Sequence, residues 1–178
     1  MKKTVWTFGL IAGAILSVMM LLTLPFLEKI GTERGYIVGY TTMVLAFLLV
    51  FFGIRSYRDN VGGGKVSFGR ALAIGTLITL VASFCYVATW EVIFYKITPD
   101  FGDKFKAAQI AKARADGGSP QVIQKKVADA EKFAELYKNP IVNIGMTLIE
   151  PLPVGLVFAL VAAGVLSRKR RPADAAST

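Results

Sequence analysis

The sequence contains no histidine and one cysteine, Cys85, and both shortages narrow the functions open to it. Without histidine, the chain lacks the commonest metal ligand and the usual general base of enzymes. A single cysteine excludes a disulfide within the chain. The sequence also lacks the paired-acid metal motifs and the Ser/His or Asp pairs that membrane enzymes use. We therefore expect no catalytic residue, no cofactor, no metal site and no enzymatic activity.

Charged residues are scarce over long stretches of the chain. Hydrophobic residues make up 54% of the 178 residues and the mean hydropathy is +0.53, which is too apolar for an ordinary soluble domain. Several apolar runs exceed the roughly 20 residues needed to cross a ~30 Å hydrocarbon core. The net charge of +9 does not indicate a nucleic-acid partner, because basic residues at the ends of membrane helices act first as topology signals. We expect a lipid bilayer as partner, and no nucleic acid.

The apolar runs predict an all-α integral membrane protein in which four transmembrane helices form one membrane domain, residues 1–178. The expected spans cover residues of about 5–27, 36–54, 68–95 and 141–166. The first run is longer than the apolar part of a secretory signal and no convincing cleavage site follows it, so we expect an uncleaved helix. The tail of about 172–178 is expected to be disordered.

Residues of about 99–138 interrupt this pattern, because they are too polar to span a membrane. Thr98-Pro99-Asp100 predicts an N-cap with proline at the first helical position, and Gly117-Gly118 predicts the end of that helix. Ser119-Pro120 begins a second helix, which Asn139-Pro140 ends. The apolar residues of this second helix recur on one face: Ile123, Val127, Ala130, Ala134 and Tyr137. We expect an amphipathic helical hairpin between the third and fourth spans, packed on itself, on the bundle or on the membrane surface.

The distribution of basic residues predicts that both termini are cytoplasmic and that the hairpin is extracytoplasmic. In this orientation the short inner segments are strongly basic. They hold Lys2, Lys3, Arg55, Arg58, Lys65, Arg70, Arg168, Lys169, Arg170 and Arg171. The hairpin is also rich in basic residues, but acidic residues are mixed among them and they lie in folded helices away from the membrane edge.

The last apolar run contains an ionisable residue and two prolines: Glu150, Pro151 and Pro153. Each proline lacks an N–H, so carbonyls four residues earlier, including that of Thr147, lose their helical partner and a bend is expected. Glu150 lies ~14 Å from the outer end of its span and should therefore face the bundle. One interpretation is a cation, proton or ligand site in a cavity opened by the bend. The other, which we favour, is a protonated side chain that bonds a freed carbonyl and stabilises the bend.

A second intramembrane carboxylate, Glu91, lies ~6 Å from the outer end of the third span at helical rise. Together with Glu150 it would share a proton or bind a cation if the two side chains face each other. The alternative is an ion pair at the membrane rim with Lys96, the nearest basic residue. We favour the ion pair.

Arg55, Arg58 and Arg70 lie at the inner ends of the second and third spans. They are candidates for contacts with anionic lipid headgroups or with a partner protein. The simpler interpretation, which we favour, is that they set the orientation of the helices.

Small residues recur at every fourth position in three of the expected spans, which lets helices approach one another closely. The three stripes are Gly9, Gly13 and Ser17; Ala71, Gly75, Thr79 and Ser83; and Gly155, Ala159 and Ala163. Such stripes serve helix packing, either within the bundle or between copies of the chain.

Three stretches together resemble a bacterial membrane family known as domain of unknown function 4199. They are Gly53-Ile54-Arg55-Ser56-Tyr57-Arg58-Asp59 with the glycines and Ser67-Phe68-Gly69 that follow, Trp90-Glu91, and Glu150-Pro151-Leu152-Pro153-Val154-Gly155. The resemblance extends over essentially the whole chain. It implies a bacterial inner-membrane protein with four helices, and it implies no activity, substrate or catalytic residue.

These observations favour a non-enzymatic inner-membrane protein that takes part in binding or assembly. Its partner would be another membrane protein or a second copy of the chain, contacted through the outer hairpin or the basic inner turn. The alternative is a small oligomeric transporter or channel with Glu150 in a proton or cation path. Four helices make a thin bundle for a carrier, and Val154, Val157 and Phe158 give Glu150 a mostly apolar neighbourhood.

Overall fold

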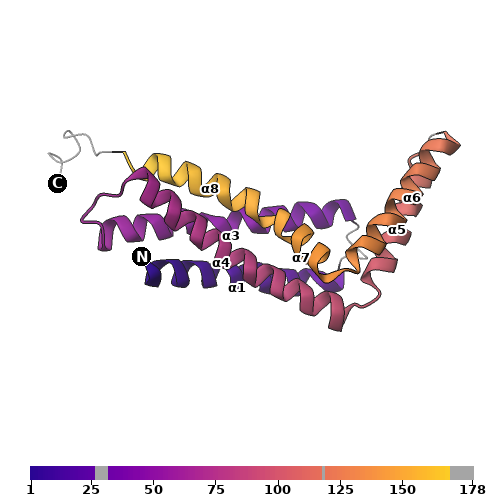
Figure 1. Cartoon of the computed structure of the whole chain (residues 1–178), viewed down its shortest axis with the longest axis horizontal. Helices are drawn as coiled ribbons and strands as arrows, with labels where there is room; N and C mark the ends of the chain where they lie inside the picture. The colour runs from indigo at the N-terminus through magenta and orange to yellow at the C-terminus, as the bar shows by residue number, and fades with distance from the viewer. Residues whose placement is uncertain (27–31, 118, 169–178) are drawn as a thin grey trace. The chain divides into compact units, whose positions relative to one another are not determined.

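The computed structural model describes residues 1–26, 32–117 and 119–168, which form helices and no strand (Figure 1). The helices, in chain order, are α1 (Lys2–Thr23), a 3-10 turn (Leu24–Phe26), α3 (Thr32–Asn60), α4 (Phe68–Val92), a π-helical turn (Ile93–Ile97), α5 (Phe101–Ala115), α6 (Pro120–Tyr137), α7 (Pro140–Ile149) and α8 (Pro151–Leu166). The expected disordered tail of about 172–178 lies outside the described residues.

Four helical stretches are long and apolar enough to cross a membrane, as the sequence predicts. They are Lys2–Phe26, Arg34–Asn60, Phe68–Ile97 and Pro140–Leu166. The shortest has 25 residues, which at 1.5 Å per residue is ~38 Å and exceeds the ~30 Å hydrocarbon core. The expectation of four long apolar helices is therefore confirmed.

The chain divides into two compact units. The bundle unit consists of Met1–Tyr86 and Glu150–Thr178, and the hairpin unit consists of Val87–Ile149. The bundle unit holds α1, α3, most of α4, and α8. The hairpin unit holds the end of α4 with the π-helical turn, and helices α5, α6 and α7.

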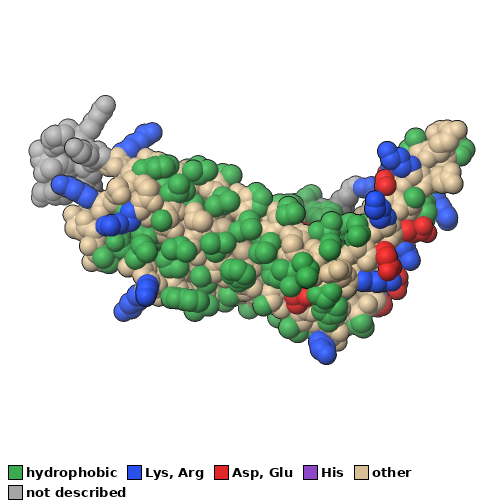
Figure 2. Space-filling view, viewed as in Figure 1, with side chains coloured by type: hydrophobic (Ala, Val, Ile, Leu, Met, Phe, Trp, Pro, Cys, Tyr) green, Lys and Arg blue, Asp and Glu red, His purple; other side chains and the backbone are tan. Residues whose placement is uncertain are grey.

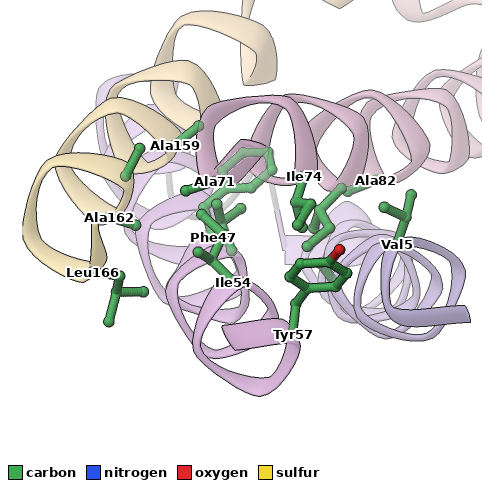
Figure 3. Packing of buried hydrophobic residues seen from close by; sticks show 14 of the residues in the cluster. Val5, Phe47, Ile54, Tyr57, Ala71, Ile74, Ala82, Ala159, Ala162 and Leu166 are labelled. Atoms are coloured by element: carbon green, nitrogen blue, oxygen red, sulfur yellow. The ribbon is translucent and has the colours of Figure 1, made fainter. Parts of the chain in front are cut away.

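In the bundle unit, α3 packs against both α1 and α8 and supplies the largest fully buried side chain, Phe47. Phe47 and Ile54 of α3 are fully buried, and Figure 3 shows Phe47 pointing into the space between α4 and α8. The facing residues are small, among them Ala71 on α4 and Ala159 on α8. Large side chains from one helix thus fill the space that small residues on its neighbours leave, which gives a dense core.

The first stripe of small residues brings α1 into close contact with α4. A Cβ atom at Gly9 would lie 2.7 Å from Cβ of Val81, and one at Gly13 would lie 2.6 Å from Cβ of Cys85. One turn further along α1, the Ser17 hydroxyl donates to the Cys85 carbonyl at 3.5 Å. The stripe therefore serves a contact within the bundle, where the backbones approach closely enough to exclude larger side chains.

The hairpin unit contains the two expected polar helices, α5 and α6, which pack against each other. Ser119 caps α6 by accepting a hydrogen bond from the Val122 N–H, with Pro120 at the first helical position, as the sequence predicts. Aromatic rings form the contact between the helices, because Phe105 lies 5.7 Å from Phe133 between ring centroids. The hairpin thus has an apolar core of its own.

The predicted N-cap at Thr98 is wrong. The Thr98 N–H and hydroxyl both donate to the carbonyl of Ile93, at 2.8 Å and 3.2 Å, so this residue ends the π-helical turn. Helix α5 begins later, at Phe101, with Asp100 in the N-cap position. The signal failed because a threonine hydroxyl can bond a carbonyl of the preceding turn as readily as an N–H of the following one.

Candidate functional site

Glu150 stands between two helices. Helix α7 ends at Ile149 and α8 begins at Pro151, so the expected bend takes the form of a break at Glu150. Pro151 and Pro153 both fall in the first turn of α8, where N–H groups have no partner inside the helix. The prolines therefore fit the start of α8 without further loss of backbone hydrogen bonds. Pro151 is fully buried, whereas Pro153 is exposed.

The partner of the Glu150 side chain is Tyr86 of α4. The Tyr86 hydroxyl donates to Glu150 Oε2 at 2.8 Å, and both residues belong to the bundle unit. Tyr36, near the start of α3, also interacts electrostatically with the carboxylate. Among the described residues, no Lys or Arg forms an ion pair with Glu150. The carboxylate is thus hydrogen-bonded to Tyr86 and lacks a compensating positive charge among the described residues.

Sequence reasoning missed Tyr86, although one signal was available. Tyr86 follows Ser83 by three residues and Thr79 by seven, so it continues the stripe that these residues form on α4. A polar aromatic residue on the face that packs against α8 is a candidate partner for a carboxylate on α8. The sequence alone does not show that α4 and α8 are neighbours.

Replacing Tyr86 with phenylalanine is expected to lower the free energy of unfolding by about 1.5 kcal/mol, because a hydrogen bond to a carboxylate is lost and Glu150 keeps its position. The measurement is thermal or denaturant unfolding of the purified protein in mild detergent. Tyr40→Phe is the matched control, since Tyr40 is 48% exposed. Equal stability of both variants would show that the Tyr86–Glu150 bond contributes nothing.

The side chain of Thr147 makes its hydrogen bonds to residues of the hairpin unit. It is 4% exposed, and its hydroxyl bonds Asn143 Oδ1 at 3.2 Å and the Tyr137 hydroxyl at 3.1 Å. Asn143 is fully buried and also accepts a hydrogen bond from Trp90 Nε1 at 3.2 Å. Its Nδ2 donates to the Tyr137 carbonyl at 3.4 Å. Asn143 therefore joins the ends of α4 and α6 to α7, a role that sequence reasoning missed although an asparagine inside an apolar run is itself a signal.

Glu91 belongs to the hairpin unit. Its Oε1 atom is buried and has no hydrogen-bond partner, and within the described residues the expected ion pair with Lys96 does not form. Lys96 lies in the π-helical turn that follows α4, whereas Glu91 lies in α4 itself. Tyr95 is the neighbour with which Glu91 interacts electrostatically.

Arg55 and Arg58 lie in the last turns of α3, and Arg70 lies in the first turn of α4. Arg58 and Arg55 both pair with Asp59, at 2.7 Å and 3.6 Å from Nε to the carboxylate oxygens. Arg70 is exposed. The Arg55–Asp59 pair is exposed, and the contribution of such a pair to stability is small.

Within the described residues, no group of three or more Cys, Asp or Glu side chains is arranged to hold a metal ion. The hairpin unit contains an open cavity of about 270 Å³, with Phe94 and Tyr95 among its walls and Asp103 and Lys138 beside them. Lys138 donates a hydrogen bond to Glu135 at 2.9 Å, and this contact raises the pKa of its ammonium group.

The fold and these sites define a helical protein with four helices that are long and apolar enough to cross a membrane. The chain belongs to the family described as "Protein of unknown function (DUF4199)", which matches residues 7–168. The resemblance seen in the sequence is thereby confirmed. Neither the curated proteins nor the solved structures contain a match to this chain.

Proposed function

We propose that this chain is a non-enzymatic, multi-pass protein of a bacterial inner membrane, with both termini in the cytoplasm. The four long apolar helices support insertion, and their exposed side chains include large hydrophobic residues such as Trp6, Leu45 and Phe84. Figure 2 shows hydrophobic side chains over the length of the bundle and basic ones at the end that carries Met1. That basic end supports the orientation, because basic residues favour the cytoplasmic side.

The proposed role is binding or assembly through the hairpin unit, with another membrane protein or a second copy as partner. The observation that carries this proposal is the internal packing of α5 on α6. Because Phe105 and Phe133 form a core within the hairpin, its charged faces and exposed residues such as Val122 and Leu136 remain available to a partner. The basic turn between α3 and α4 is the other candidate surface.

Single-cysteine variants test the orientation. In a Cys85→Ala background, Val122→Cys places a thiol on α6, and Lys65→Cys places one between α3 and α4; both positions are exposed. A membrane-impermeant maleimide applied to intact cells is expected to label position 122 and to reach position 65 only after permeabilisation. The reverse pattern would contradict the proposed orientation, and labelling of both positions in intact cells would contradict a membrane-separated arrangement.

The same thiols test the role. With a photoactivatable maleimide attached, position 122 is expected to give a discrete cross-linked product, and its mass distinguishes a second copy from another protein. Phe84→Cys, on the apolar surface of α4, is the control for random cross-linking to neighbouring membrane proteins. Cross-linked products at position 65 alone would indicate that the partner binds the basic turn. An absence of products at both positions would overturn the binding role.

A second candidate function is a small oligomeric transporter or channel with Glu150 in a proton or cation path. The observation that favours it is the Glu150 carboxylate, which hydrogen-bonds Tyr86 and has no ion pair with a described basic residue. This candidate requires proton or cation flux through the purified protein that a folded Glu150→Gln variant loses.

A further inference from the structure

Two buried hydroxyl groups on α4 lack hydrogen-bond partners. Thr79 and Ser83 are fully buried, and among the described residues neither Thr79 Oγ1 nor Ser83 Oγ has a partner. Buried polar atoms are almost always paired, so each exception calls for a physical explanation. The two residues are four apart and lie on the same face of α4.

This face of α4 leads to Glu150. Tyr86 follows Ser83 by three residues, about one helical turn, and donates to the Glu150 carboxylate at 2.8 Å. Thr79, Ser83 and Tyr86 thus share one face of α4, and Tyr86 connects this face to Glu150. We name these four residues the polar row. Its acidic member has no ion pair with a described Lys or Arg, and the titratable groups that interact with it are Tyr86 of α4 and Tyr36 of α3.

The polar row is closed at its Thr79 end. A Cβ atom at Gly155 of α8 would lie 2.7 Å from Thr79 Oγ1 and 3.0 Å from Phe47 Cε1, so these groups already touch the α8 backbone. One turn further along α4, a Cβ atom at Gly75 would lie 2.8 Å from Cβ of Ala159. Beyond this contact lie buried apolar side chains, among them Ala71 and Ala162 in Figure 3. Among the described residues, the polar row therefore ends at Thr79.

An isolated carboxylate in a membrane must either take up a proton or pair with a cation. If the four helices are inserted as proposed, the ten residues of α7 lie between the start of the fourth span and Glu150. The side chains beside it offer hydroxyl oxygens, which are ligands for hard cations. One carboxylate supplies one negative charge, whereas divalent-ion sites draw on several acidic or carbonyl oxygens. The polar row thus matches a single positive charge.

We propose that the polar row binds a monovalent alkali cation in exchange for the proton of Glu150. The carboxylate supplies the charge, and the hydroxyl oxygens of Tyr86, Ser83 and Thr79 supply neutral ligands. The exchange is balanced: the carboxylic acid releases one proton to solvent and the carboxylate pairs with one cation. This site deepens the second candidate function and rests on the proposed insertion of the four helices. The closed end makes the row a binding site and no open pore.

The test is cation addition to the purified full chain in detergent. Sodium, potassium and lithium chloride are added in turn, with choline chloride at equal ionic strength as reference. We expect at least one alkali cation to release about one proton per protein, as binding to a protonated ligand requires, and to raise Tm above the choline value. Glu150→Gln should abolish both effects. Ser83→Ala and Thr79→Val should weaken the apparent affinity at least several-fold.

Thr42→Val is the matched control, because the Thr42 hydroxyl bonds the Val38 carbonyl within α3 and lies outside the polar row. Its cation response should equal that of the wild type. If folded wild type responds to every alkali salt as it does to choline, the proposal is overturned, whether or not the Glu150 variant folds. If the Ser83 and Thr79 variants respond to the cations as the wild type does, their hydroxyl groups are not ligands. The polar row would then be overturned as a site.

The same protein in vesicles separates this inference from the functions proposed above. Cation binding without flux would support the polar row and exclude the transporter. Proton or cation flux that depends on Glu150 would support both the polar row and the transporter. If the expected maleimide labelling pattern is not found in cells, the proposed membrane orientation is overturned. Cation binding in detergent would still test the polar row.

Discussion

Replacing Gly155 with valine is expected to lower the free energy of unfolding of the bundle by about 3 kcal/mol, the upper range for inserting carbon atoms into a packed core. A Cβ atom there would lie 2.7 Å from Thr79 Oγ1 and 3.0 Å from Phe47 Cε1, with the Thr79 methyl group closer still. Thr79 and Phe47 are both fully buried. Helices α4 and α8 would have to separate, which opens the centre of the bundle.

Gly164→Val is the matched control, because it makes the same substitution on the same helix. No atom lies within 4 Å of a Cβ built at Gly164, so valine should fit there, and glycine's poor helix propensity means that stability should stay constant or rise slightly. Unfolding in mild detergent with a titrated denaturant measures both variants. Equal losses would show that the small stripe on α8 is no packing contact.

A compensating change sharpens this prediction. Thr79→Ser removes the Thr79 methyl group, the atom nearest to a Cβ at Gly155. Combining Thr79→Ser with Gly155→Ala should therefore recover part of the stability that Gly155→Ala loses alone, since contacting residues are not additive. Strict additivity of the two changes would place the clash elsewhere.

Replacing Asn143 with alanine is expected to lower the stability of the hairpin unit by about 2 kcal/mol. The substitution removes the acceptor of the Trp90 and Thr147 hydrogen bonds, and leaving buried donors unpaired costs more than one hydrogen bond contributes. Asn143 also donates to the Tyr137 carbonyl at the end of α6, so α7 loses its polar link to that helix. The expected consequence is a loosened hairpin with an intact bundle.

Tryptophan fluorescence measures this effect locally. The chain has two tryptophans, and Trp6→Phe on the exposed face of α1 leaves Trp90 as the only emitter. Asn143→Ala should shift Trp90 emission to longer wavelength and lower the midpoint temperature of the first thermal unfolding transition. Gln124→Ala, an exposed amide deletion on α6, should do neither. An unchanged Trp90 spectrum in the Asn143 variant would show that the hydrogen bond does not hold the indole.

The sequence by itself determined the helices of this protein. Four apolar runs, the polar hairpin and the cap at Ser119 are local features, and each depends only on neighbours in the chain or on a 3.6-residue period. The stripes of small residues were visible for the same reason. The break at Glu150 followed from the chemistry of proline, which lacks an N–H at any position.

Only the tertiary structure decided which side chains meet. Tyr86 and Glu150 are 64 residues apart, and Trp90 and Asn143 are 53 apart; no local pattern connects them. The Glu91–Lys96 ion pair was predicted from closeness in the chain alone. Thr98 was predicted as an N-cap, but its hydroxyl bonds the Ile93 carbonyl of the preceding turn. Helix neighbours are set by the sum of many small packing contacts over whole faces. The partners of the glutamates are thus a consequence of packing, which composition and periodicity do not encode.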